Sequence, residues 1–167
     1  RLDEDTVKMA SIEEGLESTL VLLRNKTKDM VAVEKDFDPN LAEVECLPGK
    51  LNQAFMNILN NALYAVNKKV YQEGEEPRIT LKTRVLDGEK FTVHLIDNGI
   101  GMSPETKKKL FDPFFTTKDV GEGTGLGMSI VFKIIDKHGG KIEVYSKEGE
   151  GTEFVLILPK KQPKEFA

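Results

Sequence analysis

The chain has 167 residues, which is enough for one domain with a sizeable hydrophobic core. Its net charge is −4 with both signs mixed along the chain, which argues against a non-specific nucleic-acid binder, because such a protein carries a basic patch or stripe. One cysteine and two histidines are too few for a zinc cluster or for a disulfide within the chain, and this favours a reducing compartment.

The first half of the chain predicts two helices and two strands. Apolar side chains recur at steps of three and four along residues 11–30, which is typical of an amphipathic helix. Alternating apolar and polar residues predict a strand over 31–38, and residues 41–47 are compatible with a second short strand. A second helix is expected from about Lys50 to Lys69.

The second half predicts two hairpins around one helix. The expected strands are 78–86, 90–97, 141–146 and 152–158, and the expected helix is 125–138. Residues 98–124 show no clean periodicity and are predicted to be a functional loop. Helices interleaved with hairpins predict an α+β fold, a two-layer α/β sandwich whose mixed sheet is covered on one face by helices. No apolar run reaches membrane-spanning length, and the chain opens without a signal-peptide pattern.

Four short blocks follow one another in a fixed order. They are FMNILNNALYAV at 55–66, DNGIGM at 97–102, FDPFFTTK at 111–118 and GEGTGLGMS at 121–129. In the first block, Asn57 and Asn61 are four residues apart and share one face of the predicted helix. Amide oxygens suit a hard cation such as Mg²⁺, although two amides alone are more often part of a helix surface or bonded to backbone.

The other blocks contain a carboxylate, a lysine and closely spaced glycines. Asp97 ends a predicted strand, where its carboxylate would accept a hydrogen bond from an exocyclic amine, although Asp-Asn-Gly alone also indicates a simple turn. Lys118 would meet a phosphate as a point charge, or would be a solvated surface lysine. The alternate glycines from Gly121 to Gly127 precede a helix, and free N–H groups at a helix start bind phosphate.

Together, the blocks resemble the N, G1, F and G2 boxes of the catalytic and ATP-binding domain of two-component sensor histidine kinases. This domain belongs to a superfamily that includes gyrase, a heat-shock chaperone and mismatch-repair ATPases. GEGTEF at 149–154 resembles a further element at the base of the adenine pocket. The resemblance implies a Bergerat-type fold, with a catalytic domain over 11–160, a linker remnant over 1–10 from a missing dimerisation and phosphoacceptor domain, and a tail over 161–167.

The resemblance also implies roles for individual residues. Asn61 would coordinate Mg²⁺ with support from Asn57, Asp97 would bond the adenine amino group with Thr152 nearby through water, and Lys118 would reach the γ-phosphate of ATP. The implied catalytic residues are Asn57 and Lys118, and the implied metal ligand is Asn61. The implied nucleotide-binding residues are Asn61, Tyr64, Lys68, Asp97, Gly99, Gly101, Met102, Phe111, Phe114, Thr117, Gly123, Thr124, Gly125, Leu126, Gly127 and Thr152. Residues 103–123 would form an ATP lid that the phenylalanines pin.

The first block departs from the family pattern at the adenine-stacking position. Many members carry an aromatic residue four positions after the metal-binding asparagine, where this chain has Ala65, with Tyr64 one residue earlier. Many also carry a basic residue at the position of Tyr64, and here Lys68 would take that place one helical turn later.

The expected reaction is transfer of phosphate to a histidine outside this chain. Neither His94, in a strand, nor His138, at a helix end, is followed by the acidic residue of a phosphoacceptor motif. Hydrolytic relatives carry a glutamate where this chain has Asn57, and an amide is not a general base. The implied partners are the dimerisation domain of the same protein and a response regulator, with no nucleic acid. The fragment is expected to be monomeric and the full-length protein to be a homodimer. The expected location is the cytoplasm, either for the whole protein or for the cytoplasmic part of a membrane-bound sensor. The alternatives are a nucleotide-gated binding module and an anti-sigma-type serine kinase of the same superfamily.

Overall fold

The computed structural model describes residues 6–24, 31–112 and 127–163. Its strands are β1 (Lys8–Ala10), β2 (Ala32–Asp36), β3 (Val44–Cys46), β4 (Arg78–Val85), β5 (Lys90–Asp97), β6 (Lys141–Lys147) and β7 (Gly151–Pro159). Its helices are α1 (Ile12–Arg24), α2 (Pro48–Lys68), α3 (Pro104–Lys108) and α4 (Gly127–Lys137). All the predicted helices and strands therefore appear. Where an element's predicted end lies within the described residues, the observed end differs from it by a few residues at most.

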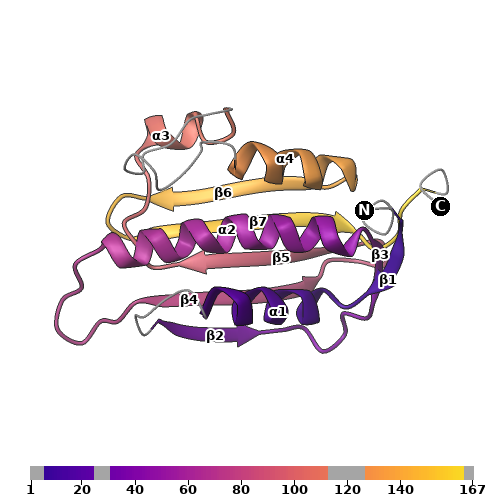
Figure 1. The fold of residues 1–167 in the computed structure, drawn as a ribbon, viewed down its shortest axis with the longest axis horizontal. Coiled ribbons are helices and arrows are strands. Elements are labelled where there is room, and N and C mark those ends of the chain that lie inside the picture. The colour runs from indigo at the N-terminus through magenta and orange to yellow at the C-terminus, as the bar shows by residue number, and fades with distance from the viewer. Residues whose placement is uncertain (1–5, 25–30, 113–126, 164–167) are drawn as a thin grey trace.

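The main sheet has five strands in the order β2-β4-β5-β7-β6 (Figure 1). β2 runs parallel to β4, and the other neighbours are antiparallel, so the sheet is mixed. β1 and β3 form a separate antiparallel pair. The predicted α+β sandwich with a mixed sheet is confirmed.

Helices α1, α2 and α4 cover one face of this sheet (Figure 1). Alternation along β5 directs Phe91, Val93 and Leu95 towards the helices, and all three are buried. From the helix side, Phe55 and Leu59 of α2 are fully buried in the same core. Removing such a core phenylalanine costs about 3–5 kcal/mol of stability, so the core fixes α2 firmly over the sheet.

Two elements differ from the prediction. Residues 98–124 were expected to lack regular structure, and this is wrong for α3, whose 5 residues form a short helix. The reason is local, because the Ser103 hydroxyl accepts from the Thr106 backbone N–H at 3.1 Å and Pro104 stands at the first helical position. The strand β1 was not expected, because 3 residues are too few to show a periodic pattern.

Candidate functional site

Three polar side chains form a row across one end of the main sheet. Strand pairing places Asp97 of β5 opposite Thr152 of β7, and Thr152 opposite Ser146 of β6. All three lie in register with apolar residues that are buried in β5 and β7 and half-buried in β6, so the row is on the face that the helices cover. A polar row at this position replaces what would otherwise be apolar core, and it marks a candidate binding site.

Asp97 is the carboxylate of this row, and only 7% of its surface is exposed. Burial raises its pKa to about 6, against the opposing effects of hydrogen bonds from the backbone N–H groups of Gly99 and Thr152 and of the charge of Lys69. The Gly99 bond measures 2.8 Å at Oδ1. A buried carboxylate is costly unless donors satisfy it, so Asp97 is well suited to accept from a ligand.

Two glycines let the backbone after Asp97 pack closely against its neighbours. A Cβ added at Gly99 would lie 2.5 Å from the carbonyl carbon of Ala65 in α2. Gly101 has a φ of +69°, and a Cβ there would collide with the backbone carbonyl of Lys147. The segment 99–101 is therefore held between α2 and the turn of the β6–β7 hairpin.

Asn98, the residue after Asp97, makes several side-chain hydrogen bonds, although the sequence predicted only a turn role for it. Its side-chain oxygen accepts from the Arg78 N–H at 2.8 Å and from the Tyr71 hydroxyl at 3.1 Å. Its side-chain nitrogen donates to the Glu76 carbonyl at 2.8 Å. These bonds join the connection between α2 and β4 to the end of β5. In the sequence, the Asn-Gly pair of the second block is the signal that could have indicated a bridging role for the Asn98 side chain.

The structure brings the first and fourth blocks together. The Asn57 side chain donates from Nδ2 to the carbonyl oxygen of Gly127 at 3.2 Å, where α4 begins. Asn61 follows one turn later on α2, and both asparagines are half-buried. The N-terminus of α4 therefore lies beside the face of α2 that carries the two amides.

The region entering the third block is also attached to α4 and to the polar row. The Phe111 ring lies 5.7 Å from that of Phe132, measured between centroids. Met102 donates its backbone N–H to the Ser146 hydroxyl at 2.9 Å. These contacts fix both ends of the described part of the segment that follows Gly101.

Near the end of α2, Tyr64 and Lys68 contact each other. The Lys68 ammonium lies 5.5 Å from the centre of the Tyr64 ring, a cation–π distance. Their expected roles at a nucleotide stay predictions. The remaining candidate residues lie outside the described part of the chain, and they are Phe114, Thr117, Lys118, Gly123, Thr124, Gly125 and Leu126.

Both histidines are engaged within the fold. His94 contacts Glu153 at 2.7 Å and the Thr92 hydroxyl at 3.0 Å, on the sheet face without helices. His138 is buried, accepts from the Leu47 N–H at 3.0 Å and contacts the Ile134 carbonyl at 2.8 Å. Each imidazole therefore has neighbours on both nitrogens.

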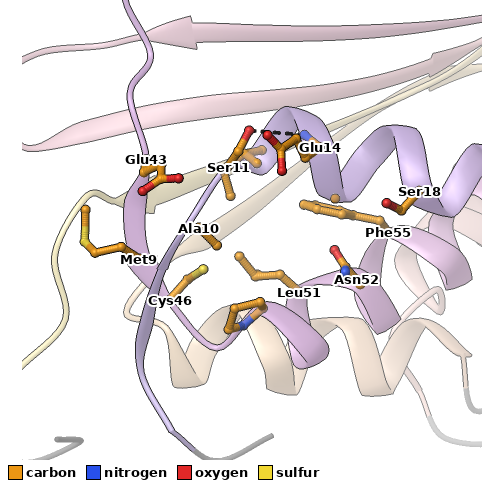
Figure 2. A pocket seen from close by; sticks show the side chains of 13 residues that line it. Met9, Ala10, Ser11, Glu14, Ser18, Glu43, Cys46, Leu51, Asn52 and Phe55 are labelled. Carbon is orange, nitrogen blue, oxygen red and sulfur yellow. Dashed lines mark hydrogen bonds between the residues drawn. The ribbon is translucent and has the colours of Figure 1, made fainter. Parts of the chain in front are cut away.

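A separate cavity of about 320 Å³ lies between β1, β3, α1 and the first turns of α2 (Figure 2). Figure 2 shows Ser11 accepting from the Glu14 N–H at the start of α1, and Asn52 and Phe55 on the opposite wall. Cys46 of β3 also lines the cavity. Burial raises the pKa of its thiol to about 11, so the thiol stays protonated at neutral pH. The cavity is at the opposite end of α2 from Ala65 and is distinct from the polar row.

Within the described residues, no group of three or more His, Cys, Asp and Glu side chains is placed to hold a metal ion. The amide oxygens of Asn57 and Asn61 are hard donors of the type that Mg²⁺ takes together with phosphate oxygens. In the same part of the chain, no helix is both long and apolar enough to cross a membrane.

Comparison with known proteins gives a consistent result. The family model described as "Histidine kinase-, DNA gyrase B-, and HSP90-like ATPase" matches residues 47–162. Sporulation kinase E of Bacillus subtilis (strain 168) is 39% identical over 135 residues, which are 81% of this chain and 17% of that protein. Sensory histidine kinase/phosphatase NtrB of Salmonella typhimurium is 37% identical over 158 residues, covering 89% of this chain and 43% of NtrB. The chain therefore spans less than half the length of these two relatives.

Among solved structures, the nucleotide-free catalytic domain of histidine kinase ThkA superposes with a TM-score of 0.77 and 32% identity. The match covers 93% of this chain and 96% of the ThkA chain. Full-length ShkA in complex with AMPPNP gives a TM-score of 0.79 at 22% identity, over 94% of this chain and 32% of ShkA. At that identity the second match concerns the fold alone.

Proposed function

The chain belongs to the histidine kinase-, DNA gyrase B-, and HSP90-like ATPase family, as a catalytic ATP-binding domain of the sensor histidine kinase type, and we propose that it transfers the γ-phosphate of Mg²⁺-ATP to a histidine on a separate dimerisation domain. The observation that carries the proposal is the buried Asp97 carboxylate, held at the sheet end beside two closely packed glycines.

At the base end of the site, Asp97 is the acceptor for the exocyclic amine of adenine. Its bonds from the Gly99 and Thr152 N–H groups orient the carboxylate and leave lone pairs for a ligand. Gly99 and Gly101 keep the adjoining wall free of side chains. This segment packs closely against residue 65, which is an alanine in this chain. Tyr64 is therefore the aromatic candidate near the base.

At the phosphate end, the start of α4 supplies backbone N–H groups and the positive end of a helix dipole. Asn61 would hold Mg²⁺, and Asn57 would position it while bonded to Gly127. Mg²⁺ held there would neutralise charge that develops on the transferring phosphate. Lys118, which is outside the described residues, is expected to reach the γ-phosphate.

Transfer is favoured over hydrolysis because Asn57 is not a general base. Water near the γ-phosphate would therefore lack a side chain at that position to remove its proton. The two histidines of the chain make poor acceptors, because His94 pairs with Glu153 and His138 is buried. The nucleophile would come from a histidine of a dimerisation domain, for later relay to a response regulator, in a full-length protein that is a homodimer.

Calorimetry with Mg²⁺-ATP tests the assignment of the base site. We expect Asp97→Asn to weaken ATP binding by about tenfold or more, because an amide nitrogen facing the exocyclic amine replaces an acceptor with a donor. Asp136→Asn, on the exposed surface of α4, is the matched control and should bind as the wild type does. Unchanged affinity in the Asp97 variant would remove the adenine assignment.

A further inference from the structure

Ser146 is the third member of the polar row, and none of the four sequence blocks contains it. Its strand β6 pairs with β7 so that Ser146 is opposite Thr152, which in turn is opposite Asp97. Ser146 is half-buried on the helix-covered face, while Thr152 and Asp97 are each 7% exposed. The serine is therefore one strand removed from the carboxylate and in direct contact with the threonine between them.

The Ser146 hydroxyl makes three polar contacts, and they can all be hydrogen bonds in one arrangement only. The Met102 backbone N–H, at 2.9 Å, can only donate, and the Gly151 carbonyl, at 3.1 Å, can only accept. A hydroxyl has a single proton, so the proton of Ser146 goes to Gly151. The third contact, 2.8 Å to the Thr152 hydroxyl, is then a bond that Thr152 donates.

This arrangement decides what Thr152 offers to a ligand. Because its one proton is directed at Ser146, the Thr152 hydroxyl presents only lone pairs to the rest of its surroundings. The neighbouring Asp97 carboxylate accepts bonds from Gly99 and likewise presents only lone pairs when ionised. Two adjacent side chains of the site are thus acceptors, and neither has a proton to donate.

We propose that Ser146 is a specificity-determining residue that, by accepting the Thr152 proton, makes the base site select a 6-amino purine over a 6-oxo purine. The proposal rests on the proposed function, in which the purine edge meets Asp97. A 6-oxo group would bring a carbonyl lone pair against two acceptors, and the site would leave it without a donor. Sites built from fixed hydrogen-bonding groups discriminate strongly against a ligand that leaves them unpaired.

Without Ser146, the Thr152 hydroxyl would be free to rotate and donate towards the ligand. A 6-oxo purine would then gain a donor, whereas a 6-amino purine would keep its acceptor, because the Thr152 hydroxyl retains its lone pairs. The bonds of Ser146 with the Met102 N–H and the Gly151 carbonyl would also be lost, but both partners are backbone groups bonded to Ser146 itself. Their loss should therefore weaken both nucleotides to the same degree, which separates a structural effect from a change of selectivity.

The test is competition binding of ATP and inosine triphosphate against a fluorescent ATP analogue, at pH 8 with Mg²⁺, for the wild type and Ser146→Ala. We expect the ratio of the two affinities to fall by about tenfold in Ser146→Ala, the effect of one hydrogen bond gained or lost. Ser146→Thr keeps the hydroxyl and should retain the wild-type ratio. Thr80→Ala, on the opposite face of the same sheet, is the control for a lost hydroxyl and should also retain it.

An unchanged ratio in Ser146→Ala, or equal weakening of both nucleotides, would overturn the role of Ser146. That result is distinguishable from failure of the proposed function, which would show as ATP binding that is absent in the wild type or insensitive to Asp97→Asn. If inosine triphosphate competes no better with Ser146→Ala than with the wild type while ATP binding stays sensitive to Asp97, only the proposal about Ser146 fails.

Discussion

Gly99 packs against Ala65 so closely that an added Cβ would lie 2.5 Å from the Ala65 carbonyl carbon. The next residue, Ile100, donates its backbone N–H to the Ala65 carbonyl oxygen at 3.2 Å. The contact joins the end of β5 directly to the last turns of α2, which carry Asn61 and Tyr64. The position of Asp97 relative to α2 therefore depends on the lack of a side chain at residue 99.

Gly99→Ala should both destabilise the domain and weaken ATP binding. The obstructing atoms are the backbone carbonyl and the Cβ of Ala65, which cannot rotate away, so we expect a loss of about 1–3 kcal/mol in the free energy of unfolding. For a domain of this size that corresponds to a fall of about 2–4 °C in Tm per kcal/mol. Thermal unfolding measures the loss, with Gly88→Ala as control, because a Cβ there meets nothing within 4 Å. Equal Tm values for the two variants would contradict the packing described.

ATP binding should depend on pH through Asp97. Its pKa is raised to about 6 by burial, so the carboxyl gains a proton as the pH falls through that value and loses its acceptor role. At pH 5 about a tenth of the free protein would have Asp97 ionised, and affinity should be about tenfold weaker than at pH 7. The ratio of wild-type to Asp97→Asn affinity removes the titration of the nucleotide itself. A ratio that is constant from pH 5 to 8 would contradict the assignment.

Much of this site was predictable from the sequence because its residues lie in short blocks with unusual spacing. Asp97 precedes two glycines, and Asn57 and Asn61 share a helix face, so the sequence alone was enough to predict all three as candidate site residues. Ser146 was missed because an isolated serine in a strand carries no signal. Its role depends on the alignment of β6 with β7, and thus on contacts between strands that a linear pattern does not contain.

The same contrast holds for the fold. Long periodic segments, such as α2 and the β4–β5 hairpin, were predicted almost to their ends. The strand β1 was not, because 3 residues paired with β3 are specified by tertiary contacts rather than by local propensity. The short helix α3 did have a local signal, since Ser103 and Pro104 are a typical helix start. Its brevity and its position among irregular residues hid it.

His138 should make the stability of the domain depend on pH. Its Nδ1 donates to the Ile134 carbonyl and its Nε2 accepts from the Leu47 N–H, so the buried ring is held neutral and its pKa is lowered, chiefly by desolvation. The unfolded chain takes up the proton near pH 6.5, before the folded protein does. The contribution of His138 is therefore fully present above pH 6.5 and is lost as the pH falls below it.

Urea unfolding of the wild type and of His138→Ala at pH 7.5 and 5.5 measures this contribution. We expect the wild type to be more stable by about 1–3 kcal/mol or more at pH 7.5, since the variant leaves the Leu47 N–H without its acceptor. The difference should shrink at pH 5.5. Comparing the two proteins at each pH cancels the opposite effect of Asp97, whose raised pKa favours folding as the pH falls. A difference independent of pH would show that the ring is not held neutral.

Asn57→Ala should lower the affinity for Mg²⁺-ATP. The variant loses the bond from the asparagine side chain to Gly127 and the expected support for the metal, and lost supporting contacts of this kind typically cost about 10–100-fold. Titration with nucleotide at several Mg²⁺ concentrations measures the effect, which should be much smaller without the metal. Asn60→Ala changes an exposed asparagine of the same helix and should bind as the wild type does. A matching loss in both variants would indicate damage to α2 rather than to the site.

Transfer of phosphate to an external histidine is tested most directly with ATP labelled at the γ-phosphate. The domain is incubated alone, and then with an isolated helical dimerisation domain of a related kinase that contains the acceptor histidine. We expect no label on the domain itself, and label on the added domain that acid removes and alkali does not, as for phosphohistidine. Stable label on this chain, or transfer in an acid-stable form typical of phosphoserine, would contradict the account.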